Sequence, residues 1–182
     1  MARIAPLAHA NAQGRPKQLL DAVRASLGVT PNMTLTMAHS AVLEGYLGLS
    51  GALSKGSISA ADAERIALAV AEYNASGYCL SAHTYLATSA VHLPNGEIQA
   101  ARRFASSDPR AAAVLAFAAA VLQTRGGVAD SDIETARVAG LSDEELSEIV
   151  GHVAVNVLTN YFNRAFAVDV DFPVVQPALH AA

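Results

Sequence analysis

The sequence of 182 residues contains one cysteine, Cys79, and no tryptophan. A single cysteine excludes a disulfide within the chain, a zinc site of the Cys-x-x-Cys type and a redox couple of two cysteines in one chain. Any redox cycle at this thiol therefore needs a second thiol from another molecule.

Charged side chains are scarce, at 15% of the residues, and the formal net charge is −4. No basic run is longer than Arg102-Arg103, so the electrostatic footprint of a nucleic-acid-binding protein is missing. Residues 1–16 hold no apolar stretch long enough for a signal-peptide core, and the longest apolar run, Ala111 to Leu122, is too short to cross a bilayer. We therefore expect a soluble cytoplasmic protein without nucleic-acid or membrane partners, in which the thiol stays reduced.

Motifs for cofactors are also missing. The sequence has no P-loop, no Gly-x-Gly-x-x-Gly and no His-x-x-x-His, and its six histidines are scattered. Cys79 and His83 alone would supply two ligands, which are too few for a zinc site. We expect no metal and no nucleotide or flavin cofactor.

Small apolar residues are abundant. Alanine accounts for 39 of the 182 residues, and 52% of the chain is hydrophobic. Alanine carries no helix-propensity penalty, and no convincing alternating strand pattern occurs. The sequence predicts one all-α, multi-helical domain of residues 1–182, with a core of about 30–168 and an extended tail, 169–182. The expected helices cover about 16–27, 31–51, 60–73, 78–91, 97–104, 109–122, 131–139 and 143–166.

The low charge also predicts self-association. A chain this apolar has few charges to cover its surface, so we expect it to bury some of that surface against copies of itself. The stretch Ala111 to Leu122 is apolar on nearly every face, which indicates a helix buried in the domain centre or at a subunit contact. A homo-oligomer is the expected state.

The segment Glu64 to His83 carries the candidate chemistry. Cys79 and His83 are four residues apart, so on one helix they share a face. A thiol near a helix start is favoured as the anion by the helix dipole, and a neighbouring imidazole can take its proton. A break at residues 74–77 folds the two helices together, which brings the Glu64 carboxylate toward the imidazole.

The spacing alone is also compatible with an unreactive, structural thiol. Cysteine is among the most buried residue types, so a structural thiol beside a satisfied histidine explains the Cys79–His83 pair as well as a reactive pair does.

The same segment resembles the signature of the alkylhydroperoxidase D-like, or carboxymuconolactone decarboxylase, family. In the redox-active branch a glutamate is followed after eleven residues by a cysteine, after two more by a second cysteine, and after three more by a histidine. Glu64, Cys79 and His83 match the glutamate, the second cysteine and the histidine. Ser76 occupies the position of the first cysteine, and Tyr78 occupies a position where some relatives carry a relay histidine.

Two further stretches extend the resemblance over most of the chain. Residues 38–47 are similar to an early helix of the family, although Ala41 stands where relatives often have proline. Residues 156–163, followed by Asp171-Phe-Pro173, resemble the closing helix and tail of a peroxidase-related subgroup.

The resemblance implies an all-α fold that assembles into dimers, trimers or hexamers, with a peroxide-reducing thiol site between helices. In redox-active relatives the second cysteine attacks the peroxide and becomes a sulfenic acid. The first cysteine resolves that acid as a disulfide, and an external partner regenerates the dithiol.

Ser76 cannot form that disulfide, and three interpretations follow. Cys79 acts as the only peroxidatic thiol and an external thiol resolves it; or Ser76 has replaced a natural cysteine; or the redox role is lost and Glu64 with His83 performs acid–base chemistry, as in a cofactor-free lactone decarboxylase. A non-catalytic scaffold on the same fold is a further alternative, and it requires that Cys79 and His83 be buried with no cavity beside them.

The working hypothesis assigns Cys79 as nucleophile for a peroxide or small organic substrate, His83 as the base and Glu64 as the group that orients it. Ser76 and Tyr78 are expected to line the site, and Ser76 can hydrogen-bond the thiolate. His152 is either a buried, hydrogen-bonded histidine or a substrate contact. Asn160 and Asn163, which follow His152 in the same expected helix, are expected to satisfy helix ends or a subunit contact.

Overall fold

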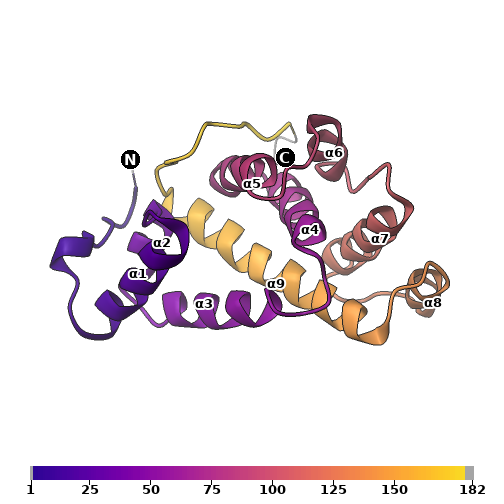
Figure 1. Ribbon diagram of the computed structural model, residues 1–182, viewed down its shortest axis with the longest axis horizontal. Coiled ribbons are helices and arrows are strands. Elements are labelled where there is room, and N and C mark those ends of the chain that lie inside the picture. The colour runs from indigo at the N-terminus through magenta and orange to yellow at the C-terminus, as the bar shows by residue number, and fades with distance from the viewer. Residues whose placement is uncertain (1, 179–182) are drawn as a thin grey trace.

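A computed structural model describes residues 2–178, and within them the chain is helical, without a β-strand (Figure 1). The elements are η1 (His9–Asn11), α1 (Gly14–Leu27), α2 (Asn32–Met37), α3 (Val42–Leu53), α4 (Ala60–Tyr73), α5 (Gly77–Ser89), α6 (Asn95–Ala101), α7 (Pro109–Gln123), α8 (Asp130–Val138) and α9 (Asp143–Phe166). The predicted all-α fold is confirmed.

Helix boundaries follow capping signals in the sequence. Ser59 accepts the amide of Asp62 at the start of α4, and Asp108 accepts the amide of Ala111 ahead of the first-turn proline of α7. A reciprocal capping box of Ser142 and Glu145 starts α9. At the other end of α1, Gly28 adopts the left-handed conformation (φ 74°) that a helix stop requires.

Helix α9 is the centre of the fold. It packs against α3, α4, α5 and α7, and in Figure 1 it crosses the middle of the molecule with α3 along one side and α4 and α5 on the other. In Figure 1, α1 and α2 lie toward its C-terminal end, and α7 and α8 lie toward its N-terminal end. The buried side chains form two clusters accordingly: one of them includes Leu20, Met37 and Leu80, and the other includes Ile66, Val114 and Ile149.

Helix α7 does not have the first of its two predicted locations, burial in the domain centre, and the second, a subunit contact, stays a prediction. Its residues Val114, Leu115 and Ala118 are buried, but Ala116 is exposed and several other alanines are only half-buried. The helix is therefore not buried on every face within one chain, because no other helix of the described chain covers its outer side.

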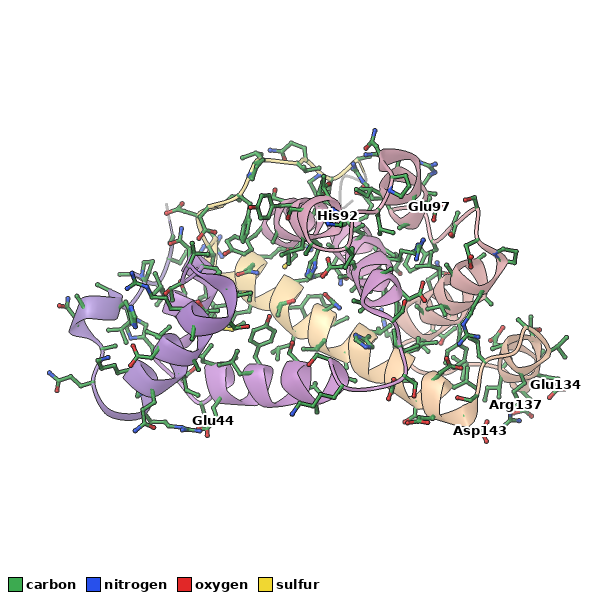
Figure 2. The ribbon with its side chains drawn as sticks, viewed as in Figure 1. Glu44, His92, Glu97, Glu134, Arg137 and Asp143 are labelled. Atoms are coloured by element: carbon green, nitrogen blue, oxygen red, sulfur yellow. The ribbon has the colours of Figure 1, made fainter. Side chains whose placement is uncertain are left out.

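Polar clusters hold the connections between the outer helices (Figure 2). The Glu97 carboxylate of α6 accepts hydrogen bonds from Ser106 and Ser107 in the linker to α7, and from Arg65 of α4. Near the start of α9, Arg137 of α8 pairs with Asp143 at 2.9 Å.

The segment after α9 is extended, as its prolines predict, and runs back across α5 (Figure 1). The amide of Val175 donates to the Ser81 hydroxyl at 2.9 Å, and Arg102 donates to the carbonyl of Gln176 at 3.1 Å. Of the predicted tail, residues 179–182 lie outside the described residues. None of the helices within residues 2–178 combines the length and apolarity that a membrane span requires.

Candidate functional site

The turn between α4 and α5 creates the site. Ala75 adopts a left-handed conformation (φ 50°), and the amide of Ser76 bonds back to the carbonyl of Ala71 at 2.9 Å. The chain therefore reverses within three residues, so that α5 returns along α4. This reversal brings Glu64 beside His83, nineteen positions later in the chain.

Glu64 and His83 form a hydrogen-bonded pair. The distance from His83 Nδ1 to Glu64 Oε2 is 2.9 Å, and both side chains are largely buried, with 23% and 18% of their surfaces exposed. A carboxylate on one ring nitrogen fixes the orientation of the imidazole and leaves Nε2 for other partners. The predicted orienting contact is therefore present.

A cavity of about 600 Å³ lies beside this pair. Cys79, His83, Glu64, Tyr78 and His152 all contribute to its wall, so the structure brings together five of the six predicted site residues. The rest of the wall is mainly apolar and comes from α1, α3, α4, α5, α9 and the tail; representative side chains are Val23, Leu47, Leu53, Ala67, Val155 and Phe172.

Ser76 is the sixth residue, and it is not among those that line the cavity. It is fully buried as the N-cap residue of α5, and its hydroxyl has no hydrogen-bond partner within residues 2–178. The expected bond from Ser76 to the sulfur of Cys79 is thus absent from the described chain.

Cys79 lies in the first turn of α5 and is 2% exposed. Its thiol donates to Thr159 Oγ1 at 3.9 Å, and the side-chain amide of Asn163 donates to the sulfur at 3.1 Å. No hydrogen bond joins the sulfur to His83 anywhere in the described chain, although both residues face the same cavity. His83 can therefore act on a molecule in the cavity, while the sulfur has partners of its own.

Tyr78 is held by its hydroxyl. It donates to Asp171 Oδ1 at 2.8 Å and accepts the amide of Met33 at 3.2 Å. Burial, together with the adjacent Asp171 carboxylate, raises the pKa of Tyr78. Because Asp171 also accepts the amide of Asn32, these bonds fasten the tail to α2 and α5.

His152 reaches the cavity from α9. It is 7% exposed, and its Nε2 atom has no hydrogen-bond partner within residues 2–178. Burial lowers the pKa of His152, so the ring is neutral near pH 7. His152 is therefore buried, as expected, but the expected hydrogen bond is missing at its Nε2 atom within the described residues.

Sequence reasoning missed three polar residues near the thiol. Thr159 and Asn163 contact the sulfur, and Tyr46 of α3 lies on the cavity wall, where burial and the neighbouring Cys79 raise its pKa. The signal for the first two was the polar series His152, Asn156, Thr159 and Asn163, which recurs every three or four positions along a largely apolar stretch of the helix.

The described part of the chain contains no cluster of side chains that could bind a metal ion. Within residues 2–178, no three His, Cys, Asp or Glu side chains lie close enough together to hold an ion.

Comparison with known proteins finds one family model that matches part of the chain. Residues 40–123 match the model of the carboxymuconolactone decarboxylase family, a segment that includes Glu64, Cys79 and His83. No curated protein matches the chain.

Solved structures with the same fold cover nearly the whole chain. An uncharacterized peroxidase-related protein with an alkylhydroperoxidase AhpD core, from Ralstonia eutropha JMP134, is 24% identical with a TM-score of 0.83, and the match covers 93% of this chain and 92% of that one. A peroxidase-related protein from Silicibacter sp. TM1040 is 24% identical with a TM-score of 0.75, over 92% and 91% of the two chains. A cysteine-to-alanine variant of the debrominase Bmp8, solved with 2,3,4-tribromopyrrole, is 22% identical with a TM-score of 0.77, again over 92% and 91%. At these identities the likeness establishes the fold.

Proposed function

We propose that this chain, whose residues 40–123 match the model of the carboxymuconolactone decarboxylase family, is a thiol peroxidase that reduces uncharged organic hydroperoxides through Cys79. The observation that carries the proposal is the shared cavity: the only cysteine of the chain and a hydrogen-bonded Glu64–His83 pair form parts of one wall. A nucleophile and an acid–base group that face the same small volume can act on one bound molecule.

The first step uses both groups. The Cys79 thiolate attacks the terminal oxygen of the hydroperoxide, so that an S–O bond forms while the O–O bond breaks. The leaving alkoxide takes a proton from His83, which Glu64 holds in place through its hydrogen bond, and the proton that Cys79 lost on forming the thiolate returns to His83 through solvent. The products are an alcohol and a sulfenic acid on Cys79.

The second half of the cycle depends on another molecule. One external thiol condenses with the sulfenic acid, giving a mixed disulfide and water. A second external thiol restores the Cys79 thiol and leaves as a disulfide. Since the chain has no other cysteine, both electrons come from outside, and a reducing compartment such as the cytoplasm supplies them.

The charge of the cavity supports an uncharged substrate. No lysine or arginine occurs among the residues that line it, and Glu64 is the only carboxylate there. His83 is already paired with Glu64, so an anionic ligand would be desolvated without a free counter-ion, which is unfavourable. The same argument weighs against acid–base decarboxylation, because its substrate carries a carboxylate.

The cavity also weighs against a purely structural role for the thiol, since a scaffold requires no space beside Cys79 and His83. A second candidate reaction is dehalogenation of a halogenated ring by the same thiol. The similarity to a debrominase whose cysteine-to-alanine variant was solved with a brominated pyrrole favours it.

A turnover assay tests the proposal. Cumene hydroperoxide is supplied with excess dithiothreitol, and trapping with dimedone followed by mass spectrometry locates the sulfenic acid. We expect turnover, labelling at Cys79 and loss of both in Cys79→Ser, with no loss in His92→Gln, a change at an exposed histidine. A thiol that stays unlabelled in native protein overturns the proposal, and release of bromide from 2,3,4-tribromopyrrole without hydroperoxide turnover selects the second candidate.

We also propose that the chain is a homo-oligomer. Val150, Leu158 and Tyr161 form an exposed apolar stripe along α9, with 46%, 39% and 58% of their surfaces exposed. The half-buried alanines of α7 are a second such surface. Light scattering is expected to give a multiple of the 18.8 kDa chain mass, and a mass of 18.8 kDa contradicts the proposal.

A further inference from the structure

We infer that Asn163 is a catalytic residue of this site: its side-chain amide holds the sulfur of Cys79 in the ionised, reactive form. The inference rests on the proposed function only in taking Cys79 to be the nucleophile. The sequence pattern assigns Asn163 only a helix-end or subunit-contact role, and the family match, which ends at residue 123, does not reach it. Asn163 lies 84 positions from Cys79.

The contact is direct. Asn163 Nδ2 lies 3.1 Å from Cys79 Sγ and 3.2 Å from the sulfur of Met33, so its two N–H groups are directed at two sulfur atoms. The residue is 3% exposed, which keeps water from competing for these bonds.

The amide is poorly matched to neutral sulfur. A thioether and a thiol are weak acceptors, whereas the carbonyl oxygen of Asn163 is buried without a partner within residues 2–178. A buried amide with one unmatched end costs free energy, and a leucine of similar size would avoid that cost. A thiolate changes the balance, because a hydrogen bond to an ionised acceptor is about twice as strong as a neutral one.

No other donor of the described chain performs this task. His83 is hydrogen-bonded to Glu64. Thr159 accepts a hydrogen bond from the thiol, and its own hydroxyl donates to the carbonyl of Asn156 at 3.0 Å. The Cys79 sulfur also lies in the first turn of the 13-residue helix α5, where the helix dipole favours negative charge. The amide and the helix start therefore act in the same direction on one atom.

The position of Asn163 suits this role. Cys79 and Thr159 belong to the cavity wall, and Asn163 does not. The amide therefore binds the sulfur from the protein side and leaves the cavity side free for a substrate to approach.

Alkylation of Cys79 by iodoacetamide at pH 7 tests the inference without any peroxide. Asn163→Leu removes the donor at similar volume, and we expect the rate constant to fall roughly tenfold or more. Asn160→Leu is the matched control: Asn160 is also buried in α9, bonds to Asn74 rather than to sulfur, and is expected to leave the rate within about twofold of wild type. An unchanged rate in Asn163→Leu, or an equal fall in both variants, overturns the inference.

A measurement on the wild-type protein covers the case in which Asn163→Leu does not fold. The side-chain amide protons of Asn163, observed by NMR, are expected to shift over the same pH range in which the alkylation rate rises. Resonances that stay fixed across that range overturn the inference.

The outcomes separate this inference from the proposed function. If Asn163→Leu slows alkylation but the wild type never reduces a hydroperoxide, the inference stands and the proposed reaction is wrong. If the wild type turns over and Asn163→Leu alkylates at the wild-type rate, only the inference is wrong.

Discussion

His83 Nδ1 lies 2.9 Å from Glu64 Oε2, and no hydrogen bond of the described chain joins this imidazole to the sulfur of Cys79, although both residues line one cavity. The contribution of His83 can therefore be measured separately from that of the Cys79 thiol, because each group has its own hydrogen-bond partners.

His83→Gln and Glu64→Gln are expected to lower hydroperoxide turnover by roughly a hundredfold, the usual contribution of a positioned proton donor. Alkylation of Cys79 by iodoacetamide is expected to stay within about twofold of wild type, since no hydrogen bond of the described chain joins His83 to the sulfur. Steady-state turnover and alkylation rates are measured side by side, with His92→Gln as control. A parallel fall in both rates contradicts this prediction and makes His83 the base that ionises the thiol.

Ser76→Cys is expected to supply the missing resolving thiol. Residues 76 and 79 are three apart at a helix start, a spacing that fits the usual separation of bridged cysteines of about 4.4–6.8 Å between Cα atoms. One equivalent of hydroperoxide should then convert the variant to an intrachain disulfide, seen as a loss of two mass units, whereas wild type gives none. Ser89→Cys, at the exposed end of α5, is the control that should not form it.

Glu97 is expected to make folding stability depend on acid pH. Hydrogen bonds from Ser106 and Ser107, with Arg65 nearby, lower the pKa of Glu97 from its ordinary value of 4.5 to about 2. A carboxylate with a lowered folded-state pKa stabilises the fold fully above the unfolded value and loses that contribution as pH falls toward 2.

The free energy of unfolding, measured in urea between pH 5 and pH 2, is therefore expected to fall more steeply for wild type than for Glu97→Gln. Glu134→Gln, at an exposed glutamate labelled with Glu97 in Figure 2, should keep the wild-type slope. Identical slopes for wild type and Glu97→Gln would show that the carboxylate is not held in this way.

Tyr78→Phe is expected to loosen the tail. The change removes the bonds of the hydroxyl to Asp171 and Met33, and two net hydrogen bonds correspond to about 1–3 kcal/mol of unfolding free energy. Hydrogen exchange at the Val175 amide, which donates to Ser81, is expected to become faster. Tyr85→Phe is the control, because this exposed tyrosine contacts the tail through its ring, which packs on Phe172, and the substitution keeps that ring. Equal exchange rates in the two variants contradict the prediction.

Local signals in the sequence determined the helices. Ser59, Asp108 and Ser142 cap helices through bonds that span three residues, and Gly28 ends α1 by a conformation that its own backbone permits. The Cys79–His83 spacing and the reversal before α5 likewise follow from residues close in the chain, so the approach of Glu64 to His83 could be anticipated.

The partners of the thiol were decided only by the tertiary structure. Asn163 and Thr159 reach the sulfur because α9 packs across α5, a contact between segments at least 80 positions apart that no local pattern specifies. The location of Ser76 was also decided by the tertiary structure. The motif spacing predicted that Ser76 lines the site, whereas in the folded chain it is buried away from the cavity wall. The sequence determined which thiol and which acid–base pair share the site, and the packing of α9 determined which groups hold the sulfur.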